Sequence, residues 1–92
     1  MYNQSKKLYV GNLPSNVSEE RLQKHFEQAG PVSSVAIPFD RETGKQRGFA
    51  FVEMNSQYSA ADAITILDGT HLEGKRIAVN SSDKPDRSKY RW

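Results

Sequence analysis

The alternation of side chains between residues 47 and 54, RGFAFVEM, predicts a β-strand with two unlike faces. Successive side chains of a strand point to opposite faces of the sheet. One predicted face therefore holds Arg47, Phe49, Phe51 and Glu53, and the other holds Gly48, Ala50, Val52 and Met54. Large aromatic rings normally lie in the core. A strand with only small and aliphatic residues on its core-facing side therefore indicates that its aromatic side has another task.

Two amphipathic helices are predicted on either side of this region. The first begins after Ser18, a residue type that favours the N-cap position, and Gly30 is expected to end it in the left-handed conformation. The second begins after Asn55 or Ser56 and ends at Asp68-Gly69. The apolar stripes at helical spacing are Leu22, Phe26 and Ala29 in the first helix, and Ala60, Ala63, Ile64 and Leu67 in the second.

The remaining pattern predicts three more strands, over residues 7–11, 32–39 and 76–80. Pro38 lies inside the second of these and indicates an edge position, because proline has no backbone N–H to donate. The order strand, helix, strand, strand, helix, strand predicts the α+β class. We expect a ferredoxin-like βαββαβ sandwich, with a four-stranded antiparallel sheet and two helices on one face.

The two helices are expected to cover the aliphatic face of the sheet and to leave the other face open. Tyr9 from the first strand then joins Phe49 and Phe51 on the open face. An exposed aromatic cluster on a small domain usually marks a binding surface. The alternative is that the chain's own tail or a protein partner buries these rings.

Composition limits the class of protein. A chain of 92 residues suits one domain, and we expect a flexible lead-in over 1–6, the domain over 7–82 and a basic tail over 83–92. We expect no membrane segment and no signal peptide, and therefore an intracellular protein, cytoplasmic or, in a eukaryote, nuclear. The net charge of +2 lies in the tail, where it favours an anionic partner, although a merely solubilising tail fits equally well.

Catalytic patterns find little support in the sequence. His25 and His71 have no partner at a fixed spacing, and Gly44-Lys45 lacks the other residues of a phosphate loop. The absence of cysteine excludes disulfides and thiolate metal sites. We therefore expect a protein that is not an enzyme and that needs no metal and no cofactor.

Two separate motifs resemble those of the RNA-recognition motif family. The octapeptide at 47–54 resembles ribonucleoprotein motif 1, K/R-G-F/Y-G/A-F-V-x-F/Y, and LYVGNL at 8–13 resembles its partner hexapeptide. The resemblance covers residues 7–82 and is closest to small single-domain RNA-binding proteins of the bacterial, cyanobacterial and glycine-rich type. Met54 stands where the family usually has an aromatic residue. By parity Met54 points into the core, so we expect an effect on packing alone.

The resemblance implies that the first and third strands are adjacent at the centre of the sheet. If Tyr9 lies opposite Phe51, then Lys7 lies opposite Glu53 and Gly11 lies opposite Phe49. Lys7 and Glu53 would form a cross-strand ion pair worth about 0.2–1 kcal/mol. Gly11 would leave open space across from Phe49.

The resemblance also implies a role for each residue of the open face. Tyr9 and Phe51 would stack on bases, Phe49 would pack on sugars, Arg47 would contact phosphate, and Asn80 would contact a base edge. The physics of single strands agrees, because splayed bases stack on aromatic rings beside cations. The further candidate RNA contacts are Lys7, Lys45, Arg76 and Lys84.

We therefore predict a monomeric module that holds about two to four nucleotides of single-stranded RNA with micromolar affinity. Single-stranded DNA stays open as a ligand, and so does a protein-interaction domain on the same fold. Simple solvated roles for Arg47, Lys45 and Asn80 also stay open. Tyr90 and Trp92 in the tail either stack on bases, cover the sheet or, as is commoner for chain ends, stay disordered.

Overall fold

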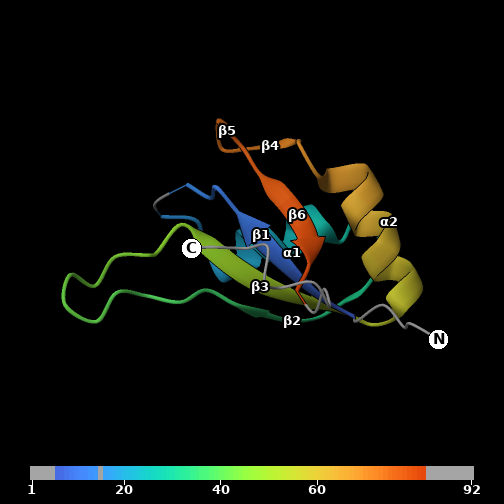
Figure 1. Cartoon of the computed structure of the whole chain (residues 1–92), viewed down its shortest axis with the longest axis horizontal. Helices are drawn as coiled ribbons and strands as arrows, with labels where there is room; N and C mark the ends of the chain where they lie inside the picture. Colours follow the sequence, from blue (N-terminus) through green and yellow to red (C-terminus); the bar gives the residue numbers. More distant parts are fainter. Residues whose placement is uncertain (1–5, 15, 83–92) are drawn as a thin grey trace, which may run out of the picture.

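Four strands form one antiparallel sheet in the computed structural model, which describes residues 6–14 and 16–82. The strand order is β2-β3-β1-β6, so β1 and β3 are central and β2 lies at an edge, as predicted. Figure 1 shows this sheet with its two helices. The main elements are β1 (Lys7–Gly11), α1 (Glu19–Phe26), β2 (Val32–Ala36), β3 (Phe49–Met54), α2 (Gln57–Leu67) and β6 (Ala78–Ser81). The ferredoxin-like βαββαβ fold is thereby confirmed.

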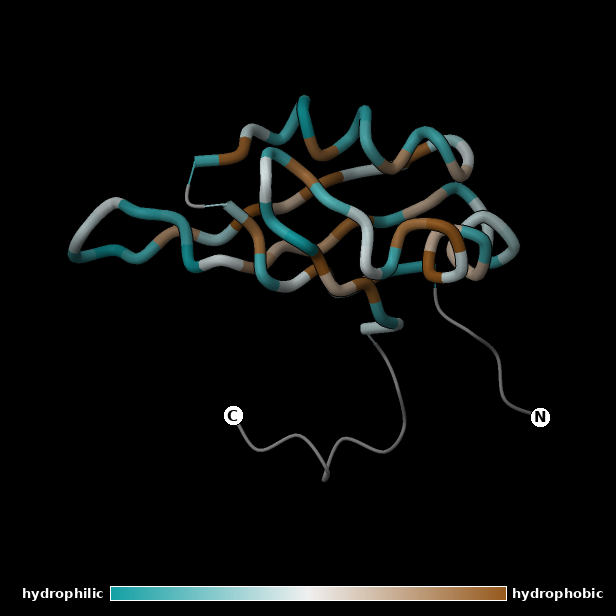
Figure 2. Tube along the Cα trace, turned by 90° about the horizontal axis from the view of Figure 1, so that it is seen from above, coloured by the Kyte–Doolittle hydropathy of each residue, from teal (hydrophilic) through white to brown (hydrophobic). Residues whose placement is uncertain are grey.

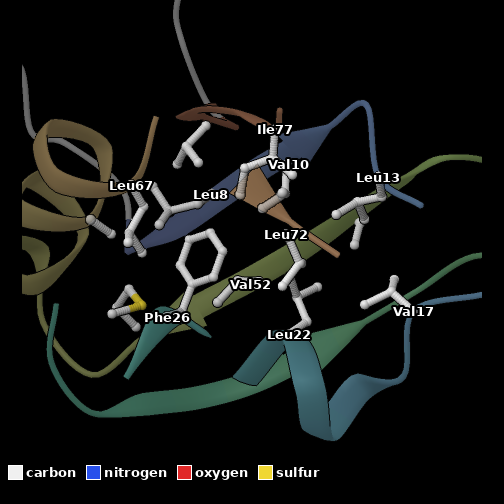
Figure 3. Close-up of a cluster of buried hydrophobic side chains, with 14 of the residues drawn as sticks. Leu8, Val10, Leu13, Val17, Leu22, Phe26, Val52, Leu67, Leu72 and Ile77 are labelled. Carbon is white, nitrogen blue, oxygen red and sulfur yellow. The ribbon is translucent and has the colours of Figure 1, made fainter. Parts of the chain in front are cut away.

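The core lies between the sheet and the two helices. In β3 the residues Ala50, Val52 and Met54 are buried, while the alternate residues of the strand are only half-buried. Figure 3 shows Phe26 and Leu22 of α1 and Leu67 of α2 among the side chains of the central strands. The prediction that the aliphatic face is the covered face, with Met54 in the core, is therefore confirmed.

Both helices begin at the predicted caps. The Ser18 hydroxyl accepts a hydrogen bond from the Arg21 N–H at 3.0 Å, and the Ser56 hydroxyl accepts one from the Ser59 N–H at 3.1 Å. These bonds satisfy backbone donors that have no partner within the helix. The second helix ends at Leu67, before Asp68-Gly69, as the sequence indicated.

The end of α1 differs from the prediction. The helix stops at Phe26, and turns follow before Gly30, whose φ of +151° is not the left-handed helical conformation. A Cβ at Gly30 would lie 2.5 Å from the Ser59 Oγ of α2. Glycine at this position therefore allows the chain after α1 to approach α2 closely, and this approach depends on tertiary packing.

Two predicted strands are shorter than expected. β2 ends at Ala36 rather than Phe39, and β3 begins at Phe49 rather than Arg47. Gly48 interrupts the alternation because its φ is +87°, far from an extended strand. Pairing continues irregularly beyond the sheet, with the Arg47 N–H donating to the Pro38 carbonyl and a bridge between Phe39 and Gln46. Residues 38–47 form the arm that projects in Figures 1 and 2, and it is mostly hydrophilic.

The predicted last strand is divided in the structure. Arg76 belongs to a small hairpin of β4 (His71–Leu72) and β5 (Lys75–Arg76), and β6 begins two residues later. The turn of this hairpin has Glu73 at φ +51° and Gly74 at φ +89°. Positive φ at both central residues is the geometry that suits the twist of a two-residue hairpin. The sequence does not indicate this hairpin, because the region has no alternating apolar pattern.

Candidate nucleic-acid interface

Three aromatic rings meet on the face of the sheet opposite the helices, and we call Tyr9, Phe49 and Phe51 the aromatic cluster. The Tyr9 and Phe49 rings are stacked, with centroids 5.8 Å apart and planes at 27°. Phe51 meets Tyr9 edge-on at 6.0 Å and Phe49 edge-on at 5.8 Å. These separations are typical of interacting aromatic pairs. All three rings are half-buried, so each keeps some surface for a ligand.

The predicted register between β1 and β3 is confirmed. Tyr9 pairs with Phe51, Lys7 with Glu53, and Gly11 with Phe49. One oxygen of the Glu53 carboxylate also accepts a bond from the Ser34 hydroxyl at 3.5 Å. The register allows the ion pair between Lys7 and Glu53, which stays a prediction.

The space expected across from Phe49 is not open. A Cβ at Gly11 would lie 3.1 Å from Cε2 of Tyr9 and 3.2 Å from its Oη, so the Tyr9 ring fills this space. Strand side chains lean along the strand direction. In this chain Tyr9 leans over the residue two positions further along its own strand.

Arg47 reaches the aromatic cluster from outside β3. Its guanidinium carbon lies 5.7 Å from the centroid of the Phe49 ring, within the range of a cation–π interaction. Strand parity alone could not establish this contact, because the turn at Gly48 separates Arg47 from the regular strand. The structure thus places the predicted phosphate contact beside the rings.

The other predicted contacts are distributed around the sheet. Asn80 is exposed on β6 and pairs with Tyr9, and Lys7 is exposed on β1. Lys45 is exposed on the arm, and Lys84 lies outside the described residues, as do Tyr90 and Trp92.

Arg76 does not lie on the sheet. Its backbone carbonyl accepts a bond from Nδ2 of Asn12 at 2.6 Å, on the hairpin of β4 and β5. Its guanidinium lies beside Gly69, where a Cβ would be 3.4 Å from Nη2. The prediction of Arg76 inside the last strand was therefore wrong, and this side chain is not part of the aromatic cluster.

Gln46 lies next to Arg47 and has a role in the fold that the sequence did not indicate. Its Oε1 accepts a bond from the Val17 N–H at 3.2 Å, and its Nε2 donates to the Val17 carbonyl at 2.5 Å. This pair of bonds ties the arm, next to Arg47, to the segment before α1. The two residues are 29 positions apart, and no local pattern indicates that they meet.

His25 lies on α1, where both nitrogens of its ring make hydrogen bonds within the fold. The Thr70 hydroxyl donates to the Leu67 carbonyl, so it accepts from Nε2 of His25 at 3.1 Å. The other ring nitrogen, Nδ1, then accepts from Nε2 of Gln28 at 3.3 Å. Burial, and after it the charge of Arg21, lowers the pKa of His25 below its ordinary value of 6.5. These contacts favour a neutral imidazole.

Acidification is therefore expected to destabilise the fold. Because the pKa of His25 is lowered in the folded state, the unfolded chain takes up this proton at a higher pH than the folded chain. The contribution of His25 is fully present above its ordinary pKa of 6.5 and is lost as the pH falls through the lowered value. Urea denaturation between about pH 7.5 and pH 5 should show a smaller pH dependence for His25→Gln than for the wild type. Equal dependence in the two proteins would contradict this assignment.

Within the described ranges, no helix is long and apolar enough to span a membrane, and no group of three or more histidine and carboxylate side chains is arranged to hold a metal.

Comparisons with known proteins agree with this geometry. The pattern described as the RNA recognition motif matches residues 8–78. The 31 kDa chloroplastic ribonucleoprotein of Nicotiana sylvestris is 44% identical over 96% of this chain, which spans only 27% of that protein. The putative RNA-binding protein RbpD of a Nostoc species is 47% identical over 82% of this chain and 80% of its own length.

Solved structures lead to the same group. The crystal structure of RNA-binding protein PG1 has a TM-score of 0.80 and 40% identity, over 87% of this chain and 96% of that one. The structure of the Rna15 RRM with bound RNA (GU) has a TM-score of 0.77 and 30% identity, over 89% of this chain and 87% of that one.

Proposed function

The chain belongs to the RNA recognition motif family, and from this premise we propose that it binds single-stranded RNA on the open face of its sheet. The observation that carries the proposal is the aromatic cluster, three rings within 6.0 Å of one another on the face that neither helix covers. Single-stranded bases are splayed out and can stack on such rings. The Rna15 RRM, a relative in structure, has RNA bound. None of the relatives described above favours the alternative of a protein-interaction domain.

The geometry supports a division of tasks among the three rings. Tyr9 and Phe51 are direct cross-strand partners in the central strands, so two successive bases can stack on them. Phe49 already has the Tyr9 ring stacked against it and Arg47 over it. A sugar, which needs only the remaining edge of the ring, is therefore the contact that we propose for Phe49.

Polar contacts complete the proposed site. Arg47 lies beside the rings and would bind the phosphate between the stacked nucleotides. Asn80 pairs with Tyr9 and would reach the edge of the base stacked on it. We propose Lys7 and Lys45 as outer phosphate contacts, and Arg76 and Lys84 as contacts available only to a longer RNA.

The expected affinity follows from these contacts. Two stacked bases contribute about 2–6 kcal/mol, whereas micromolar binding requires about 8 kcal/mol. The phosphate contacts must supply the remainder, so we propose modest affinity for about two to four nucleotides. We assign the domain a binding role rather than a catalytic one. A monomeric state and an intracellular location remain predictions.

Fluorescence anisotropy with labelled random-sequence oligonucleotides tests this function. Single-stranded RNA should bind, and duplex RNA of the same length should bind much more weakly, because paired bases cannot stack on the rings. Single-stranded DNA in the same assay measures discrimination by the 2′-hydroxyl. Equal binding of duplex and single strand would contradict base stacking on the sheet.

Deletion of residues 83–92 is expected to weaken binding to all RNA sequences about equally. The deletion removes Lys84, Arg87, Lys89 and Arg91, and each phosphate contact changes the salt slope by about 0.7 for a single strand. The slope of log K against log salt should therefore flatten by up to about 3. A full-length variant with these four residues changed to glutamine is the matched control and should reproduce the deletion. Unchanged affinity at low salt would show that the tail makes no electrostatic contact.

A further inference from the structure

Gly11 lies on the open face of the sheet and is nevertheless buried. The heavy atoms nearest to an ideal Cβ at this position belong to the Tyr9 ring. An ideal Cβ at position 11 would be 3.1 Å from Cε2, 3.2 Å from Oη and 3.4 Å from Cζ of Tyr9. The first two distances are shorter than ordinary van der Waals contacts, which begin at 3.4 Å. The ring therefore occupies the place that any larger residue at this position would need.

Backbone conformation does not explain the glycine. The other five glycines of the chain have positive φ angles, and Gly11 is not among them. A residue with a side chain could adopt the strand conformation of Gly11 without strain, and most would favour it, because glycine weakens strands. The contact with Tyr9 is thus the physical reason for a glycine here.

Gly11 and its two cross-strand neighbours form a shallow depression under the Tyr9 ring, which we call the seat. On β3 the partner of Gly11 is Phe49, and on β6 its partner is Ala78, whose side chain is small. Tyr9 lies in this seat with its ring stacked on Phe49 at 27°. With a Cβ at position 11, the Tyr9 ring would have to shift by a few tenths of an ångström, which would disturb its stacking on Phe49.

We propose that Gly11 is a positioning residue for RNA binding. By lacking a Cβ, it holds the Tyr9 ring along β1 and against Phe49, and so sets the plane on which a base stacks before RNA arrives. This proposal rests on the proposed RNA-binding function. A ring that is already held in place loses less freedom on binding, which strengthens affinity.

Gly11→Ala is therefore expected to weaken RNA binding by about three- to tenfold, the loss that follows when one side chain must be ordered on binding. The loss should be absent when Gly11→Ala is introduced into Tyr9→Ala, since that protein has no ring to displace. This double-mutant cycle separates positioning of Tyr9 from a direct effect of the added methyl on RNA.

Two measurements on the free protein test the ring position without RNA. In NMR spectra the Gly11 Hα resonances should be displaced by the Tyr9 ring current, and this displacement should disappear in Tyr9→Leu. The urea midpoint should rise when Gly11→Ala is made in Tyr9→Ala, because alanine favours a strand more than glycine does, and should rise less in the presence of the Tyr9 ring.

The outcomes distinguish the two proposals. If the wild type binds RNA and Gly11→Ala binds it equally well, the positioning role is overturned and the function stands. If the added methyl weakens binding equally with and without Tyr9, Gly11 acts by direct contact and positioning is again overturned. If the wild type binds no RNA, both proposals fail, whatever the NMR spectra show of the ring.

Discussion

Phe51→Ala is expected to weaken single-stranded RNA binding by about fivefold to 150-fold while the protein stays folded. One base would lose its stacking platform, which is worth about 1–3 kcal/mol. The Phe51 ring is only half-buried. Its truncation would remove two edge-on ring contacts from the folded protein, one with Tyr9 and one with Phe49. At about 0.5–1.5 kcal/mol for each of the two contacts, the free energy of unfolding should therefore fall by about 1–3 kcal/mol.

The measurements are RNA anisotropy and urea denaturation on the same preparation. Tyr58→Ala is the matched control, because Tyr58 is 76% exposed on α2 and lies outside the aromatic cluster. Loss of that ring should leave RNA affinity unchanged. If Phe51→Ala lowered stability as much as a core substitution, the open-face interpretation would be wrong.

Phe26→Ala should have the opposite effects, a large loss of stability and no change in RNA affinity. Phe26 is fully buried on α1, at the centre of the side chains in Figure 3. Its truncation should reduce the free energy of unfolding by about 3–5 kcal/mol, through lost burial and the cavity that remains. This is a large part of the roughly 5–15 kcal/mol that stabilises a typical domain. The folded fraction should bind RNA with unchanged affinity, because the ring does not reach the open face.

Urea denaturation measures the stability loss, and anisotropy at low temperature measures binding by the molecules that remain folded. Phe26→Leu is the control, because it keeps an apolar side chain in the core and should cost much less than alanine. A variant that kept wild-type stability but lost RNA binding would place Phe26 in the interface and contradict the fold.

Together these variants test whether binding and core packing belong to opposite faces of the sheet, as the β3 sequence predicts. Strand parity separates Phe49 and Phe51 from Ala50 and Val52, and the structure confirms both the parity and the register with β1. Parity depends on local geometry, because side chains alternate with a period of two. The register joins distant strands, but it is constrained by parity, since a one-residue slip would bury the wrong set of side chains. The helix caps at Ser18 and Ser56 were predictable from local geometry too, since each bond spans three residues.

Contacts between distant segments could not be predicted in this way. The bonds between Gln46 and Val17 join loops that only the folded chain brings together. Arg47 meets Phe49 through the turn at Gly48 and not through strand parity. The hairpin that removes Arg76 from the sheet depends on two positive φ angles that the apolar pattern does not reveal.

The sequence by itself determined which face of each central strand is aromatic and where the first helix begins. It limited the start of the second helix to Asn55 or Ser56, and the pairing of the two central strands rested on the family resemblance as well. Tertiary structure alone decided where the Tyr9 ring lies, because its place over Gly11 depends on the small residues and on the Phe49 ring that neighbouring strands bring to the same row. Periodicity assigns a side chain to a face of the sheet. Its direction on that face is set by the volumes of its neighbours, which are known only when the strands are assembled.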